Sequence, residues 1–172
     1  ILFGVVAWQY GWTMAAFGGL ILTALLIALT FIDADTQYLP DSLTLPLIWL
    51  GLLFNLNGTF VPLKSAVLGA VFGYMSLWLL CFIYKLLTGK IGMGNGDFKL
   101  LAALGAWLGA GILPVLVFMA ALIGLIGAII GRVAKGQYFA FGPSLAIAGW
   151  IILVANEPVH RAVTWWLTKS GF

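Results

Sequence analysis

The chain has 172 residues, of which 63% are hydrophobic and 8% are charged, and its mean hydropathy is +1.14. These values predict an all-α integral membrane protein and exclude an ordinary soluble domain. The net charge of +3 is small and dispersed, so we expect no nucleic-acid partner. The single cysteine, Cys81, excludes a disulfide framework and a cysteine-based zinc site, and we expect no metal site in this chain.

Uncharged stretches of sequence, taken in chain order, predict the membrane spans of the first half. They cover residues 12–32, 42–56 and 65–84. The first is long enough to cross a bilayer, since about 20 residues suffice, and it ends at Asp33. The second is shorter and follows the turn signal Leu39-Pro40-Asp41, which predicts the beginning of a new helix.

The second half of the chain begins with a glycine-rich stretch at 88–96, which we expect to be a loop. Residues 100–131 are uncharged over a length too great for a single helix across about 30 Å of hydrocarbon. We therefore expect a hairpin of two helices, broken near 109–111 and Pro114. A last span is expected over 141–156, followed by an interfacial tail.

Together these stretches predict one membrane-embedded domain over 1–172, a helix bundle with about six to seven transmembrane segments. Between Asp33 and Asp97 the chain crosses the membrane twice, so both carboxylates return to the same face. Lys and Arg residues occur in two loops on that face, at 85–99 and 132–140, which makes the face cytoplasmic by the positive-inside rule. Basic residues of the tail fall on the opposite face, and the two agreeing internal loops outweigh them.

Four of the five acidic side chains stand at the ends of long apolar stretches. They are Asp33, Asp35, Asp41 and Asp97. An ionised carboxylate is costly there unless it faces water or a partner, so acids in such places indicate a functional site. A solvated loop at a helix end, with Asp41 or Asp97 as a helix N-cap, is the alternative interpretation. With Asp33 and Asp97 on one face, the chemistry most readily built is a pair of carboxylates acting on water.

Gly94 and Gly96 stand just before Asp97. Two glycines beside a carboxylate at a membrane face allow a positive φ and a close approach of the backbone to an extended peptide. Lys99 is interpreted as a lysine that extends its ammonium group to the interface rather than as a catalytic group. We expect Gly94, Gly96, Asp41 and Lys99 to support the carboxylate pair.

Small residues recur through the apolar stretches and predict close contacts between helices. Two pairs have the Gly-x-x-x-Gly spacing that lets helix backbones approach one another, Gly69 with Gly73 and Gly127 with Gly131. The dipeptide Gly142-Pro143 is consistent with the start of the last helix and by itself indicates no function.

Three separated motifs occur in order along the chain. Residues 31–41 read Phe-Ile-Asp-Ala-Asp-Thr-Gln-Tyr-Leu-Pro-Asp, residues 92–100 read Gly-Met-Gly-Asn-Gly-Asp-Phe-Lys-Leu, and residues 141–143 read Phe-Gly-Pro. In this order, with apolar spans between them, they resemble the bacterial type IV prepilin peptidase family over nearly the whole chain. Through the short Gly-x-Gly-Asp motif alone, the chain is also similar to presenilin-like and archaeal preflagellin proteases.

The resemblance implies an aspartic endopeptidase in the lipid bilayer of the bacterial inner membrane, with its active site facing the cytoplasm. The family's paired catalytic aspartates, the first of the Phe-Ile-Asp segment and that of Gly-x-Gly-Asp, correspond to Asp33 and Asp97. The implied substrate is a prepilin or pseudopilin, whose short basic leader is removed just after a glycine in type IV pilus assembly or type II secretion. Peptide cleavage by such a pair is expected to need no cofactor.

Bifunctional members of that family carry an N-terminal cytoplasmic segment with two zinc-binding Cys-x-x-Cys pairs and methylate the new N-terminus with S-adenosylmethionine. No such segment occurs in this sequence, which begins at Ile1 without a Met, and this favours a partial chain over a peptidase without the second activity. Zinc and S-adenosylmethionine are therefore expected only in a full-length protein. Two other classes stay open: an ion-coupled carrier, which would usually show inverted repeats, and a structural membrane subunit.

Overall fold

The computed structural model describes residues 1–89, 93–130 and 141–155, which form helices without any strand. The helices are α1 Leu2–Tyr10, α2 Met14–Thr36, α3 Asp41–Phe54, α4 Leu63–Thr88, α5 Asn95–Leu108, α6 Leu113–Ile130 and α7 Gly142–Val154. Two short 3-10 helices, η1 Asn55–Asn57 and η2 Ala110–Ile112, follow α3 and α5. The predicted basic loop at 132–140, Gly131 and the expected tail lie outside the described residues. The all-α prediction is confirmed, while α1 was not anticipated.

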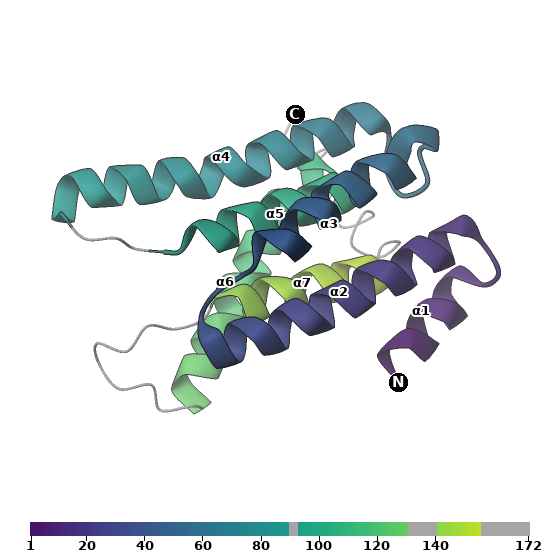
Figure 1. The fold of residues 1–172 in the computed structure, drawn as a ribbon, viewed down its shortest axis with the longest axis horizontal. Coiled ribbons are helices and arrows are strands. Elements are labelled where there is room, and N and C mark those ends of the chain that lie inside the picture. Colours follow the sequence, from purple (N-terminus) through teal and green to yellow (C-terminus); the bar gives the residue numbers. More distant parts are fainter. Residues whose placement is uncertain (90–92, 131–140, 156–172) are drawn as a thin grey trace, which may run out of the picture.

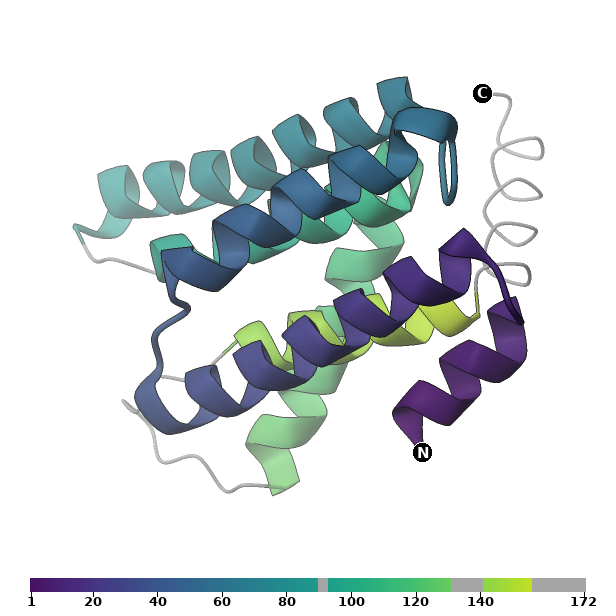
Figure 2. The ribbon, with the colours of Figure 1, turned by 45° about the vertical axis from the view of Figure 1, so that its right-hand side comes forward.

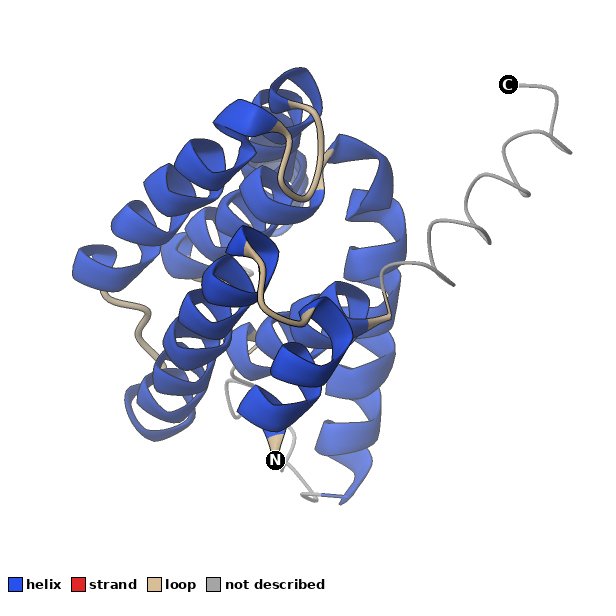
Figure 3. Ribbon diagram, turned by 90° about the vertical axis from the view of Figure 1, so that its right-hand side faces the viewer, coloured by secondary structure: helices blue, strands red, loops and turns tan. Residues whose placement is uncertain are grey.

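The helices form two layers. One layer contains α3, α4 and α5, and the other contains α1, α2 and α7 (Figures 1 and 2). The layers meet chiefly where α5 packs against α7, and α6 runs from the first layer to the second and packs on α7. Viewed along the helices of the two layers, the described chain is a bundle of helices (Figure 3).

Among the described residues, three helical segments are long and apolar enough to cross a membrane. They are Met14–Thr36, Leu63–Thr88 and Ala110–Ile129, and the apolar helix Gly142–Val154 is shorter. Large hydrophobic side chains such as Phe72, Leu80 and Phe118 are exposed on the outside of the bundle. A surface of this kind suits lipid, and the chain is a helical membrane protein. The count of six to seven spans stays a prediction.

Helix α5 is the centre of the bundle, because every residue from Leu100 to Leu108 is buried. Its neighbour α4 approaches it through glycines: a Cβ atom built on Gly69 would clash with the backbone of Gly105, and one built on Gly73 would lie 2.7 Å from the carbonyl oxygen of Leu101. The first of the predicted Gly-x-x-x-Gly pairs therefore brings two backbones into contact, as small residues do between membrane helices.

The predicted break in the long uncharged stretch is confirmed. Helix α5 ends at Leu108, and Gly109 turns the chain with a φ of 87°, a value that glycine adopts without strain. A Cβ atom at Gly109 would also lie 2.7 Å from the Ser65 hydroxyl, which accepts a hydrogen bond from the Ala110 amide. Helix α6 then leaves in a new direction (Figure 2).

Candidate active site

The predicted site residues lie at one end of the bundle, where α2 ends and where α3, α5 and α7 begin (Figure 2). Asp33 does not end its helix as expected, since α2 continues through one more turn to Thr36. Gln37 then adopts a left-handed conformation, with a φ of 53°, and its amide donates to the Asp33 carbonyl oxygen at 2.9 Å. Asp33 therefore projects from a complete helical turn, and its main chain is fixed by the helix end.

Asp97 lies in the first turn of α5, which begins at Asn95, inside the stretch 88–96 that the glycines predicted to be a loop. Gly94 is the N-cap residue with a φ of −74°, and no side chain caps this helix. Asp97 is the third helical residue, so the N-cap alternative is wrong for it. The expectation of a positive φ is also wrong, because neither Gly94 nor Gly96 has one.

Both aspartates face a common pocket of about 350 Å³. Its lining residues are Asp33, Gln37, Tyr38, Leu39, Asp41, Gly94, Asn95, Gly96, Asp97 and Lys99. Asp33 is 5% exposed and Asp97 is 8% exposed. The Oδ2 atom of Asp33 has no hydrogen-bond partner among the described residues. Buried polar atoms normally have hydrogen-bond partners, and Asp33 Oδ2 and Trp150 Nε1 are the exceptions among the buried side-chain atoms of the described residues.

The two carboxyl groups influence each other. Asp97 precedes the buried apolar run of α5 and lies outside the three long membrane helices. Burial, and then the charge of Asp33, raise the pKa of Asp97 to about 7. A carboxyl group with a pKa near neutrality can hold a proton while its partner is ionised, which is the arrangement that acid–base catalysis on water requires.

Asp41 and Lys99, predicted to support the pair, contact each other at the edge of this pocket. Lys99 Nζ donates to Asp41 Oδ1 at 2.6 Å, and the two side chains are 23% and 51% exposed. Asp41 is the first residue of α3, Pro40 is the N-cap residue, and no side chain caps the helix. The cap interpretation of Asp41 is therefore wrong, and the ammonium group of Lys99 meets a carboxylate instead of only the interface. The pair joins α3 to α5.

Two neighbours of the aspartates were missed or left without a role by the sequence. Leu39 is 4% exposed although it belongs to a connecting segment, and Gly142 begins α7. A Cβ atom at Gly142 would lie 2.5 Å from Asp33 Oδ2. The signals available were an apolar residue in a polar linker and the Phe-Gly-Pro motif, and neither specified a position beside a carboxylate.

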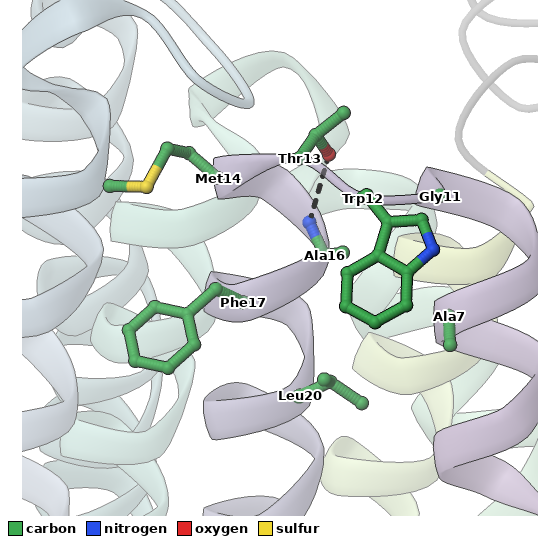
Figure 4. A pocket seen from close by; sticks show the side chains of 8 residues that line it. All are labelled: Ala7, Gly11, Trp12, Thr13, Met14, Ala16, Phe17 and Leu20. Atoms are coloured by element: carbon green, nitrogen blue, oxygen red, sulfur yellow. Dashed lines mark hydrogen bonds between the residues drawn. The ribbon is translucent and has the colours of Figure 1, made fainter.

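A larger cavity of about 600 Å³ lies between α1 and the start of α2 (Figure 4). It is lined by Ala7, Gly11, Trp12, Thr13, Met14, Ala16, Phe17 and Leu20. The only hydroxyl group among them, that of Thr13, accepts a hydrogen bond from the Ala16 amide as the cap of α2. Since none of these side chains ionises, this cavity offers no acid or base, and the chemistry of the described chain is concentrated at the aspartates.

Comparison with known proteins agrees with the motifs. Residues 20–129 match the model of the type IV leader peptidase family. Proteins named prepilin leader peptidase/N-methyltransferase are similar over most of the chain. The Neisseria gonorrhoeae protein is 74% identical over 98% of this chain and 59% of its own length, and the Pseudomonas aeruginosa protein is 49% identical over 100% and 60%. The Aeromonas hydrophila protein is 55% identical over 92% of this chain and 54% of its own length.

The chain thus spans a little over half the length of these curated relatives. No significant match to a solved structure was found. The matched range includes both aspartates, the pocket residues between them and most of the helices that carry them. On the strength of this match and of the identity to its relatives, the chain belongs to the type IV leader peptidase family.

Proposed function

We propose that residues 1–172 form the membrane-embedded aspartic peptidase domain of a longer protein, and that Asp33 and Asp97 are its catalytic pair. The observation that carries the proposal is the pocket that holds both carboxyl groups, one from each layer, with Asp33 Oδ2 unpartnered among the described residues. Family membership and the printed name of the relatives support peptide cleavage as the reaction.

The reaction is hydrolysis of a peptide bond. The ionised carboxylate takes a proton from water as the water oxygen attacks the scissile carbonyl carbon, and the protonated carboxyl group donates to the carbonyl oxygen. In the collapse of the tetrahedral intermediate the C–N bond breaks, the leaving nitrogen takes a proton from one carboxyl group, and a hydroxyl group of the intermediate returns its proton to the other, which restores the singly protonated pair. Because two close carboxyl groups titrate as one unit, the acid and the base are roles of the pair and not of one residue.

The substrate is a prepilin or pseudopilin with a short basic leader and an apolar helix. The name of the relatives supports a prepilin leader as the segment removed. We place the enzyme in the bacterial inner membrane with the pocket toward the cytoplasm, so that the leader reaches the aspartates without crossing the bilayer. The pocket is lined by three aspartates and one lysine, a balance of charge that is compatible with a basic leader.

Methylation of the new N-terminus, the second activity in the relatives' name, is proposed only for the whole protein. The methyl donor would be S-adenosylmethionine. The described residues contain no group of three or more His, Cys, Asp or Glu side chains that could hold a metal ion, so zinc is assigned to no described residue of this chain.

The test is cleavage by the purified full-length protein in detergent, with a prepilin as substrate and leader removal followed by mass. The unmutated protein should remove the leader, Asp97→Asn should not, and Asp35→Asn should act like the unmutated protein because this side chain is exposed beside the motif. Cleavage by Asp97→Asn at the normal rate would reject the proposed pair. No cleavage by any form would favour a carrier or a structural subunit.

Orientation has its own test. Cysteines introduced at Thr36 and at Thr88, which are both exposed at the pocket end, should react with a membrane-impermeant thiol reagent only from the cytoplasmic side. Reaction of either position from the periplasm would reverse the proposed topology without affecting the assignment of the pair.

A further inference from the structure

Leu39 lies in the four-residue connection between α2 and α3, whose other members are exposed or half-buried. Its neighbour Tyr38 is 63% exposed, whereas Leu39 is 4% exposed and belongs to the hydrophobic core. Leu39 also lines the pocket that contains Asp33 and Asp97. An apolar side chain is therefore held inward among the polar groups of the site.

The Leu39 side chain packs between two glycines, each of which adjoins an aspartate. A Cβ atom at Gly96 would lie 2.7 Å from Leu39 Cβ, and one at Gly142 would lie 3.2 Å from Leu39 Cδ1. Gly96 directly precedes Asp97, and Gly142 lies against the carboxylate of Asp33. The absence of side chains at both glycines thus makes room for Leu39.

These contacts connect the two layers at the site. Gly96 and Asp97 belong to α5 in one layer, while Asp33 and Gly142 belong to α2 and α7 in the other. The connection that carries Leu39 passes from the second layer to the first (Figure 2). Its side chain is therefore a spacer whose size limits how closely the two aspartate-bearing backbones approach.

We propose that Leu39 is a positioning residue that sets the separation of Asp33 and Asp97 and restricts the water around them. It touches the backbone beside each aspartate and acts through the pair. The inference rests on the proposed function of that pair. It concerns the geometry of the dyad, where a displacement of about 1 Å can cost about a hundredfold in rate.

Truncation of Leu39 has two expected consequences. The layers lose their spacer, so the carboxyl groups leave their best geometry, and the space left by the side chain admits water. Few other charged or ionisable groups of the described chain lie near the two aspartates. The Asp41–Lys99 ion pair and Tyr38 line the pocket, and Cys81 of α4 is close enough to interact electrostatically with Asp97. None of them fills the space of the leucine.

The experiment compares Leu39→Ala, Leu39→Met and Leu22→Ala in the full-length protein. Leu22 is fully buried in the middle of α2, away from the pocket, and its truncation controls for a general loss of packing. Leu39→Ala should lower kcat about tenfold to a hundredfold with little change in KM. Leu39→Met, which keeps most of the volume, should recover most of the rate.

The dependence of kcat on pH gives a readout that a purely structural role would not change. Water admitted beside Asp97 reduces the burial that keeps its carboxyl group protonated, so Leu39→Ala should lose activity at a lower pH than the unmutated protein. Leu22→Ala should keep the normal profile. Equal profiles and equal kcat for Leu39→Ala and Leu22→Ala would overturn the inference about Leu39.

A second variant changes the other partner of the contact, Gly96 of α5. Gly96→Ala places a Cβ atom against Leu39 and should lower kcat, whereas Gly111→Ala, which meets no atom within 4 Å, should not. Combined with Leu39→Gly, which also removes the Cβ atom 2.7 Å from the new methyl group, Gly96→Ala should cost less than the product of the two single effects, because both act on one contact. A fully multiplicative loss would overturn the inference. The proposed function is tested separately, since it fails only if Asp97→Asn still cleaves or the unmutated protein does not.

Discussion

Two buried polar side chains at opposite ends of the bundle, Asn55 and Asp33, differ in their hydrogen bonding. At the end away from the pocket, Asn55 is fully buried and its amide is saturated: Nδ2 donates to the carbonyl oxygens of Ala106 and Trp107, and Oδ1 accepts from the amides of Phe60 and Val61. At the pocket end, Asp33 is almost as buried, but its Oδ2 has no partner among the described residues.

This difference in hydrogen bonding distinguishes a buried polar group that stabilises the fold from one that indicates a functional site. A saturated buried amide fixes the turn after α3 against the end of α5 and leaves nothing for a ligand. A buried carboxylate oxygen without a hydrogen bond costs free energy unless the group is protonated or bound, and a carboxyl group in such a place in a membrane protein indicates a functional site. Each prediction below tests one side of this contrast.

The largest effect is expected at the pocket end. Asp33→Asn and Asp97→Asn should each lower the cleavage rate at least about a thousandfold, and the double variant should be hardly slower, because residues that act as one unit are strongly non-additive. Initial rates in membranes at matched expression check this. Normal cleavage by Asp33→Asn, together with an inactive Asp35→Asn, would move the first catalytic residue two positions along α2, to Asp35.

At the opposite end, the change should affect stability and not rate. Asn55→Ala leaves four backbone groups, two carbonyl oxygens and two amides, without their side-chain partner. It should lower the free energy of unfolding by about 3 kcal/mol. Thermal unfolding in detergent measures this, with Asn57→Ala, exposed in the same short helix, as the control. A lower rate per folded molecule in Asn55→Ala would show that the two ends are coupled.

The pH dependence of cleavage should report the raised pKa of Asp97, about 7. The pair works while one proton remains on it, so activity is retained below this pKa and is lost as the pH rises through it, to about a tenth one unit higher. Rates at saturating substrate between pH 6 and pH 9 measure the effect. A profile that stays flat to pH 9 would mean that neither carboxyl group needs its proton.

The smallest effect is expected for the ion pair at the edge of the pocket. Because Asp41 is 51% exposed, Asp41→Asn should cost only about 0.5–1 kcal/mol of stability, and cleavage should fall less than tenfold. The charge exchange Asp41→Lys with Lys99→Asp should recover part of the loss. If Asp41→Asn abolished cleavage in a folded protein, Asp41 would belong to the catalytic group itself.

The sequence predicted those features that depend on the hydrophobic pattern and on the number of times the chain crosses the membrane. It indicated the all-α membrane fold, the break near Gly109, and the return of Asp33 and Asp97 to one end, because an uncharged stretch and a count of crossings determine each of these. The pairing of the two aspartates in catalysis stays a prediction, as does the number of spans.

What the sequence could not provide depends on contacts between distant segments. Gly96 was expected to need a positive φ, whereas it lies in a helix and is small because Leu39 packs against it. Asp41 was interpreted as a cap, and its partner is Lys99, 58 positions away. Propensity rules consider only residues that are close along the chain. They therefore explained Gly96 and Asp41 by local conformation, whereas contacts with distant segments explain both residues.

The division of the aspartates between two layers bears on how the proposed site is completed. Asp33 lies on the second helix and Asp97 on the fifth, and the helix that lies against Asp33 comes last among those described. The proposed site therefore draws on segments from nearly the whole described chain. A chain truncated before α7 would lack the glycine that lies against Asp33, so we expect such a chain to be inactive as a peptidase.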